Sequence, residues 1–317
     1  MAPKPKTEEI PIPQASDEPY FGSVAFFKHI ILGVVFLMIF VPVMCCLILM
    51  VKNRQLKQAM NAYWQEAQAA LPAEAEATDE QQAFFAETPD YTSLYPDMVL
   101  PQPARNTVQE QNIVYLTFDD GPSRLTEQVL DILAEYDVKA TFFAVPKEDE
   151  TSANRMRRVV DEGHTLAMHS YEHDYAKMYA SVENYLDDIH HAYEIIHEAT
   201  GIYPQVFRFA GGSMNAYNSA IHQELISEML RRGFVYFDWN ATAGDATTRV
   251  PSPETLAASA LKAAGQYSRV VLLMHDSAGK DNLLEALPQI IEGYREAGYT
   301  FAPLTPEVTP VVFSYTD

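Results

Sequence analysis

The chain has 317 residues and a formal charge of −21, from 22 basic and 43 acidic side chains. Its length suffices for one large domain or two small ones, and its 48% hydrophobic share argues against both wholesale disorder and a polytopic membrane protein. So acidic a chain lacks the basic surface that phosphate binding requires, and we expect no nucleic-acid partner.

The first distinct element is an apolar run without a formal charge, Ile30–Val51. As a helix this run would be about 33 Å long, which matches the core of a bilayer. It is longer than the apolar part of a cleavable signal peptide and leads into a basic segment that begins at Lys52. We therefore predict one uncleaved transmembrane helix over residues 29–51, preceded by a short segment, 1–28. Basic residues on both sides leave its orientation undecided.

Residues 52–110 are expected to form a stalk and a linker. Apolar residues from Leu56 to Leu71 recur at helical spacing, which predicts a short amphipathic helix after the span. From Pro72 to Glu110 there are eight acidic side chains, one basic side chain and several prolines, a composition typical of a linker. The main folded domain would then occupy residues 111–317.

In this main domain, short apolar runs alternate with amphipathic segments. The pattern predicts strands at 113–117, 140–145, 165–168, 206–209, 234–237, 270–274 and 300–302, and helices at 125–136, 181–200, 220–232, 253–265 and 282–297. Parallel strands need crossover connections, which helices supply. The alternation therefore predicts an α/β fold with a mostly parallel sheet, either open or closed into a barrel.

Polar side chains stand at or near the ends of these strands. They are Asp119 and Asp120 after the first, His169 after the third, Arg208 within the fourth, Asp245 after the fifth and His275 at the end of the sixth. In parallel barrels, catalytic groups come from the C-terminal ends of several strands. We therefore expect these side chains to meet in one site.

Two pairs of residues near the strand ends have the composition of a metal site in a hydrolytic enzyme. Adjacent carboxylates at a strand end, Asp119 and Asp120, could divide the roles of base and metal ligand, although a polar turn accounts for the same residues about as well. His169 and His173, four residues apart, suit zinc or a similar divalent ion, with Asp120 as a third ligand and an open position for water. Chance spacing of the two histidines is the alternative.

Two further residues are ambiguous when each is taken alone. An arginine in a buried strand, such as Arg208, must pair with an acid, and Asp119 is the natural partner. A histidine that ends an apolar strand, such as His275, is by itself more typical of a packed core residue. Their occurrence together with the carboxylates favours a functional interpretation.

Five motifs, in this order, resemble the polysaccharide deacetylase (NodB homology) family, carbohydrate esterase family 4, which includes membrane-anchored peptidoglycan deacetylases. They are Thr-Phe-Asp-Asp-Gly-Pro at 117–122, His-Ser-x-x-His at 169–173, Phe-Arg-Phe-x-Gly-Gly-Ser at 207–213, Asp-Trp-Asn-x-x-x-Gly-Asp at 238–245 and Leu-Met-His-Asp at 273–276. The similarity covers residues 112–302. It implies a distorted (β/α) barrel of about seven strands that hydrolyses the acetamido group of an N-acetylated glycan.

The resemblance also implies roles for the acid–base residues. Asp119 corresponds to the catalytic base and Arg208 to the residue that orients it. His275 corresponds to the general acid, and Asp245 to the acid that tunes His275.

For the remaining candidates, the resemblance implies a metal centre and a substrate pocket. Asp120, His169 and His173 correspond to the ligands of one divalent metal ion, with zinc expected first and cobalt, nickel or manganese as alternatives. Gly211 corresponds to a backbone N–H that stabilises an oxyanion, and Leu273 to a residue that lines the acetyl pocket.

The expected protein is a membrane-anchored, metal-dependent deacetylase of N-acetylglucosamine or N-acetylmuramic acid residues in peptidoglycan. Its catalytic domain would lie outside the cell, with residues 1–28 in the cytoplasm. The alternatives are the same chemistry on another N-acetylated polysaccharide or chito-oligosaccharide, and a non-catalytic glycan-binding module. A non-catalytic module predicts the loss of a metal ligand or of the base, and the sequence retains all of them.

Overall fold

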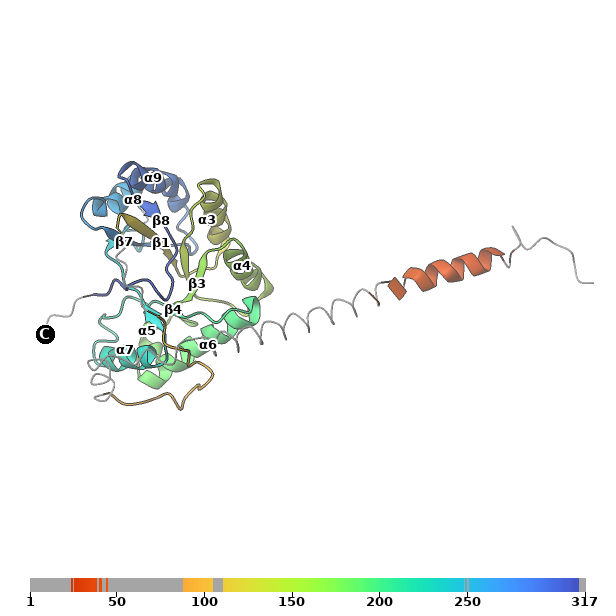
Figure 1. Ribbon diagram of the computed structural model, residues 1–317, viewed down its shortest axis with the longest axis horizontal. Helices are drawn as coiled ribbons and strands as arrows, with labels where there is room; N and C mark the ends of the chain where they lie inside the picture. Colours follow the sequence, from red (N-terminus) through yellow and green to blue (C-terminus); the bar gives the residue numbers. More distant parts are fainter. Residues whose placement is uncertain are drawn as a thin grey trace, which may run out of the picture. The chain divides into compact units, whose positions relative to one another are not determined.

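The computed structural model describes residues 24, 26–38, 40, 41, 44, 88–104, 111–247, 249 and 251–313. The chain divides into two compact units, Met1–Glu74 and Ala75–Asp317 (Figure 1).

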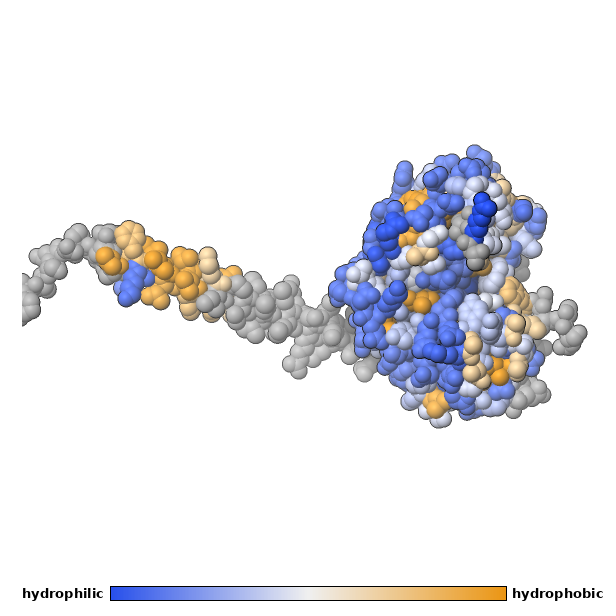
Figure 2. Space-filling view, turned by 180° about the vertical axis from the view of Figure 1, so that it is seen from behind, coloured by the Kyte–Doolittle hydropathy of each residue, from blue (hydrophilic) through white to orange (hydrophobic). Residues whose placement is uncertain are grey.

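In the first unit, the described residues are helical and mostly apolar. Residues 26–38 form a continuous helical stretch whose apolar side chains from Phe27 on are exposed, and Figure 2 shows a largely hydrophobic surface there. Within the part of the chain that the structure describes, no helix has both the length and the apolar character needed to cross a membrane. Most of the second half of the predicted span, 29–51, lies outside the described residues, as does the predicted stalk. The transmembrane span and the stalk therefore stay predictions.

The second unit is built on an eight-stranded sheet whose strands pair in parallel. The order is β5-β4-β3-β2-β1-β7-β6, with β8 also paired to β1. The bounds are β1 Ile113–Asp119, β2 Thr141–Ala144, β3 Thr165–Met168, β4 Val206–Phe207, β5 Val235–Tyr236, β6 Ala241–Thr242, β7 Arg269–His275 and β8 Thr300–Phe301. Since β5 and β6 end the order without pairing with each other, the barrel is open there. The predicted parallel, barrel-like α/β fold is confirmed in this open form.

Helices cover one face of this sheet. They are α3 Arg124–Glu135, α4 Glu150–Asp161, α5 Tyr175–Met178, α6 Val182–Thr200, α7 His222–Arg231, α8 Pro253–Ala260 with a 3-10 turn Leu261–Ala263, and α9 Asn282–Glu296. Their contacts run in the order α8, α9, α3, α4, α6, α7, so neighbouring helices form a continuous layer (Figure 1). Five of them begin at a serine or aspartate whose side chain accepts a backbone N–H, as expected of helix N-caps.

Three short or polar elements were not predicted: α4, α5 and β6. The apolar pattern of α4 is weak, because Met156 and Val159 are the only apolar side chains that it buries. The sequence signal available for it was its N-cap, Asp149, whose side chain accepts the N–H of Ser152. β6 has two residues, too few to show any period.

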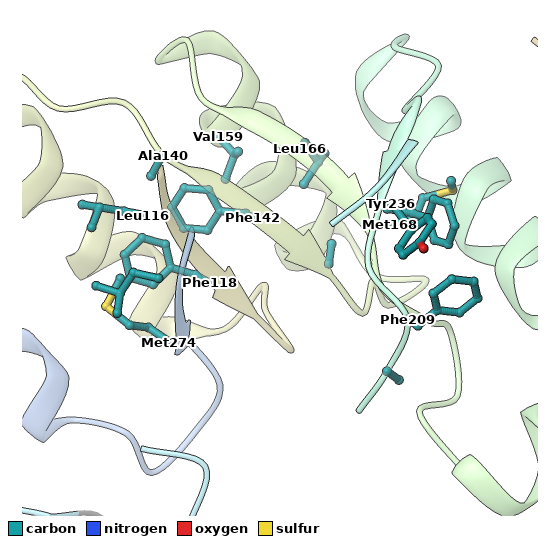
Figure 3. Packing of buried hydrophobic residues seen from close by; sticks show 14 of the residues in the cluster. Leu116, Phe118, Ala140, Phe142, Val159, Leu166, Met168, Phe209, Tyr236 and Met274 are labelled. Atoms are coloured by element: carbon teal, nitrogen blue, oxygen red, sulfur yellow. The ribbon is translucent and has the colours of Figure 1, made fainter. Parts of the chain in front are cut away.

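The side chains of each strand alternate between two cores. In β1, Val114, Leu116 and Phe118 belong to the core between sheet and helices, where Phe118 stacks on Phe142 with ring centroids 5.1 Å apart (Figure 3). Tyr115 belongs to the second core, on the opposite face of the sheet. Because side chains in a strand alternate with a period of two, Asp119 lies on the same face as Tyr115. We call this face, which is opposite the helices, the inner face, and the second core the inner core.

The same period places the other candidate residues on the inner face. Ala167, Val206 and Val271 belong to the inner core, and His169, Arg208 and His275 follow them by two or four positions. Residue pairing brings Asp119 beside His275 across β1 and β7. The fold thus delivers polar groups from β1, β3, β4 and β7 to one end of the inner face.

The described part of the predicted linker, residues 88–104, packs on the domain. The buried guanidinium of Arg232 donates to the carbonyl oxygens of Tyr91 and Leu94, both at 2.7 Å, and its Nε pairs with Glu228 at 2.7 Å. An arginine that satisfies several backbone carbonyls fixes the path of the chain there. This stretch is therefore part of the folded unit and not a free linker.

Candidate active site

An ion pair between Asp119 and Arg208 lies at the centre of the site. Arg208 is fully buried at 0% exposure, and its Nη1 donates to Oδ1 of Asp119 at 2.7 Å and to Oγ1 of Thr117 at 2.8 Å. Its guanidinium also lies 4.1 Å from the ring centroid of Phe143. Burial raises the pKa of Asp119, while the charge of Arg208 opposes this shift. The result is a fixed carboxylate whose basicity is increased.

The three predicted metal ligands lie together beside this pair. One potential ligand atom from each of Asp120, His169 and His173 lies within 4.8 Å of the other two. Oδ1 of Asp120 is 3.5 Å from Nε2 of His169 and 3.2 Å from Nε2 of His173. Donor atoms around a tetrahedral zinc ion are about 3.3 Å apart. The spacing of this group therefore fits a divalent metal.

The state of the two imidazoles supports the same interpretation. Nδ1 of His169 lies 2.9 Å from the carbonyl oxygen of Arg208, which can only accept, so the proton is on Nδ1 and Nε2 carries a lone pair. Burial lowers the pKa of His169 to about 3, which keeps the ring neutral. Nε2 of His173 is buried, and apart from its close approach to Oδ1 of Asp120 it has no hydrogen-bond partner among the described residues. A metal ion would satisfy this atom.

Asp188 of α6 holds the loop between the two histidines. Its carboxylate accepts the hydroxyl of Ser170 at 2.8 Å and the N–H groups of Tyr171 and Glu172 at 2.9 and 2.8 Å. The hydroxyl oxygen of Ser170 in turn accepts the N–H of His173 at 2.8 Å. His173 has φ +57°, a conformation that costs a non-glycine residue energy, so the contacts from Asp188 maintain it.

The sequence analysis did not identify Asp188, because this residue belongs to none of the five motifs. One signal was available: Asp188 lies at helical spacing from Tyr185 and Ala192, three residues before it and four after it, which are both buried. An acid on the apolar face of a helix must be paired.

Replacing Asp188 by asparagine should weaken metal binding. Asparagine has no negative charge, and its amide has one acceptor oxygen for the donors that use both carboxylate oxygens in the wild type. The loop is therefore held less firmly. We expect zinc affinity, measured by competition with a chromophoric chelator, to fall about 10-fold or more. Asp187→Asn is the matched control, because the neighbouring Asp187 accepts the hydroxyl of Tyr95 instead. Equal zinc affinity in wild type and Asp188→Asn would contradict this role.

His275 and Asp245 form a second hydrogen-bonded pair. Oδ1 of Asp245 is 2.9 Å from Nδ1 of His275, and Oδ2 accepts the backbone N–H of the same histidine at 2.7 Å. Burial opposes the charged imidazolium, but the hydrogen bond and charge of Asp245 outweigh this, so the pKa of His275 is raised. Among the described residues, no hydrogen bond is found for the other ring nitrogen, Nε2.

Gly211 and Leu273 also lie at this end of the barrel. Gly211 follows β4 with φ +77°, and within the described part of the chain no hydrogen bond uses its N–H. Leu273 of β7 is buried and pairs with Thr117 of β1 in the sheet. The structure therefore brings all nine predicted residues to the C-terminal ends of the strands.

An open parallel barrel with a buried carboxylate–arginine pair, a histidine–aspartate pair and a three-residue group that fits a metal defines a hydrolytic enzyme. The comparisons with known proteins agree. The sequence profile described as polysaccharide deacetylase matches residues 106–230. A peptidoglycan-N-acetylglucosamine deacetylase of Bacillus cereus is 31% identical over 202 residues, which cover 63% of this chain and 71% of the relative.

Solved structures give the same result. The catalytic domain of a peptidoglycan N-acetylglucosamine deacetylase from Eubacterium rectale matches with a TM-score of 0.63 and 33% identity, covering 68% of this chain and 98% of that domain. A polysaccharide deacetylase from Bacillus cereus matches with a TM-score of 0.57 and 30% identity, covering 64% and 96%. The chain belongs to the polysaccharide deacetylase family.

Proposed function

We propose that this chain is a metal-dependent N-deacetylase that hydrolyses N-acetylglucosamine residues of peptidoglycan. The observation that carries the proposal is the convergence of Asp119 with Arg208, His275 with Asp245, and the metal-binding group at one end of the barrel. The names of the relatives from Bacillus cereus and Eubacterium rectale support N-acetylglucosamine as the sugar. N-acetylmuramic acid in the same polymer is the alternative.

The reaction begins with attack by water on the acetamide carbonyl carbon. A divalent ion held by Asp120, His169 and His173 would polarise the carbonyl and acidify the water. Asp119 accepts the proton of the attacking water, and the ion pair with Arg208 holds its carboxylate in position.

The attack places negative charge on the carbonyl oxygen, and in this proposal the N–H of Gly211 donates a hydrogen bond to that oxygen. The bond between the carbonyl carbon and nitrogen then breaks, and His275 gives a proton to the departing nitrogen. The products are acetate and a glycan with a free amine. Asp245 stabilises the charged form of His275 before this transfer.

The substrate has to be recognised locally, because a chain with a charge of −21 does not attract an anionic wall polymer by its overall field. Cavities of about 430 and 450 Å³ border the loop between the two metal-binding histidines. Tyr171, Glu172 and Lys177 line both of them. Side chains of these types can hydrogen-bond and stack on sugar rings, which supports binding of the neighbouring units of a glycan strand.

The proposal is tested by acetate release from three substrates under the same conditions: peptidoglycan strands, N-acetylated chito-oligosaccharides and O-acetylated xylan. We expect the highest kcat/KM with peptidoglycan, and free amines equal in amount to the released acetate. A higher kcat/KM with chito-oligosaccharides would overturn peptidoglycan as the preferred substrate and leave N-deacetylation standing. Release from xylan alone would overturn N-deacetylation.

Removing the negative charge of Asp245 should move the pH profile of the reaction. His275 must be protonated to act as an acid, and its raised pKa keeps it protonated to higher pH. Asp245→Asn lowers that pKa, so we expect the basic limb of kcat against pH to move to lower pH. The profile is obtained from initial rates of acetate release. A basic limb that stays in place would contradict the role of Asp245.

We also propose that the apolar run Ile30–Val51 anchors the chain in a membrane, with the catalytic unit on the outer side. The uncharged sequence of this run and the exposed apolar side chains of its described residues support the proposal. The full chain should stay in the membrane fraction after alkaline carbonate washing, and protease added to intact protoplasts should remove the catalytic unit. Release by carbonate would overturn the anchor.

A further inference from the structure

A tyrosine that no motif includes lies between a metal-binding histidine and the backbone of Gly211. Tyr175, the first residue of α5, packs its ring edge-on against His173 with centroids 5.2 Å apart. A Cβ at Gly211 would lie 2.9 Å from Cε2 and 3.3 Å from the hydroxyl oxygen of Tyr175. The phenol therefore occupies the space that any side chain at position 211 would need.

The packing of Tyr175 fixes the ring from three sides. Besides His173, its neighbours are Tyr179 at 6.1 Å and Tyr217 at 5.5 Å between ring centroids, both edge-on. Tyr179 is itself held by a hydrogen bond from its hydroxyl to the carbonyl oxygen of Ala210, at 2.8 Å. A ring held in this way offers its hydroxyl in one place, which is what a preorganised donor requires.

No hydrogen bond within the fold accounts for the hydroxyl of Tyr175. Across the described residues, no hydrogen bond to this hydroxyl is found; the hydroxyls of Tyr185 and Tyr193 also have none, but those two rings are buried in the core between sheet and helices. The ring is half-buried, so its polar end lies beside the catalytic groups without a protein partner. A substrate group is the available acceptor.

We propose that Tyr175 is a catalytic residue whose O–H donates a hydrogen bond to the acetamide oxygen as that oxygen becomes negatively charged. This inference rests on the proposed deacetylation. The hydroxyl acts beside the N–H of Gly211, keeps its proton throughout and forms no covalent bond. Glycine at position 211 is required because a larger residue would displace the phenol, besides having to adopt φ +77°.

Tyr175→Phe tests the assignment because it removes one oxygen and keeps the ring. A hydrogen bond to developing charge is worth more in the transition state than in the ground state. We expect kcat for acetate release to fall about 10- to 100-fold, with KM changed less than about threefold. Zinc content and Tm should equal those of wild type. Tyr203→Phe, which alters an exposed tyrosine that stacks on His197 and has no contact with Tyr175 in the described residues, is the control and should retain kcat within about twofold.

A binding measurement provides a readout that does not depend on turnover. We expect an N-acetylated oligosaccharide to bind Asp119→Asn and the double variant Asp119→Asn/Tyr175→Phe with dissociation constants within about threefold of each other, measured by calorimetry. Wild-type kcat in Tyr175→Phe, or a raised KM with unchanged kcat, would overturn the assignment and leave the proposed function standing. No acetate release from wild type would overturn the proposed function, and the role of Tyr175 with it.

Discussion

Replacing Asp119 by asparagine is expected to lower kcat for acetate release by about 10²- to 10⁴-fold, the usual contribution of a general base. Asparagine has the shape of aspartate but cannot accept the proton of the attacking water. Its amide keeps an oxygen that can face Arg208, so the fold should persist. The rates are measured with peptidoglycan strands at saturating and limiting concentrations.

The control for Asp119→Asn is Asp281→Asn, which removes a carboxylate from an exposed pair with Arg124. That variant should have wild-type kcat. Zinc content should be unchanged in both variants, because Asp119 is not one of the three expected ligands. If Asp119→Asn retained kcat within about threefold, another group would have to be the base.

Replacing Arg208 by methionine is expected to have the largest effect on stability. The substitution leaves Asp119 buried at 3% exposure without its partner, and removes donors to Thr117 and Phe237. Loss of one partner of a buried ion pair lowers the free energy of unfolding by about 3–5 kcal/mol. The measurement is denaturant unfolding of the full chain, followed by a spectroscopic signal of the folded domain.

Activity of Arg208→Met should also change with pH in a defined direction. Arg208 opposes the raised pKa of Asp119, so its removal raises that pKa further and the carboxylate forms at higher pH. The acidic limb of the pH profile should therefore move to higher pH. Arg124→Met, which alters an exposed pair, should cost less than about 1 kcal/mol and leave the profile in place. Equal stability of Arg208→Met and wild type would contradict the account of this ion pair.

The strands and the meeting point of their polar ends could be predicted because both depend on local pattern. Apolar runs such as 113–117 and 270–274 have β-branched and aromatic residues of the kind that central parallel strands bury. The period of two then decides which face each residue occupies, and Asp119 and His275 share one. The contact between Asp119 and Arg208 followed from the need of a buried arginine for an acid.

The parts that could not be predicted depend on contacts between residues distant in sequence. The segment 88–104 has the composition of a linker, and only the buried Arg232 shows that it is fixed to the domain. Tyr175 follows His173, a candidate metal ligand, closely in sequence, but its proposed role comes from its packing beside Gly211, on another loop. Asp188 likewise holds a loop from which it is separated in sequence by α5 and the first turns of α6.

The most direct test of the central claim is acetate release from peptidoglycan by the full chain before and after metal removal. The chain is treated with a chelator, its metal content is verified by elemental analysis, and stoichiometric zinc is then returned. We predict that release stops without metal and recovers with zinc. Unchanged release from metal-free protein, or no release from any sample, would contradict a metal-dependent deacetylase built on Asp120, His169 and His173.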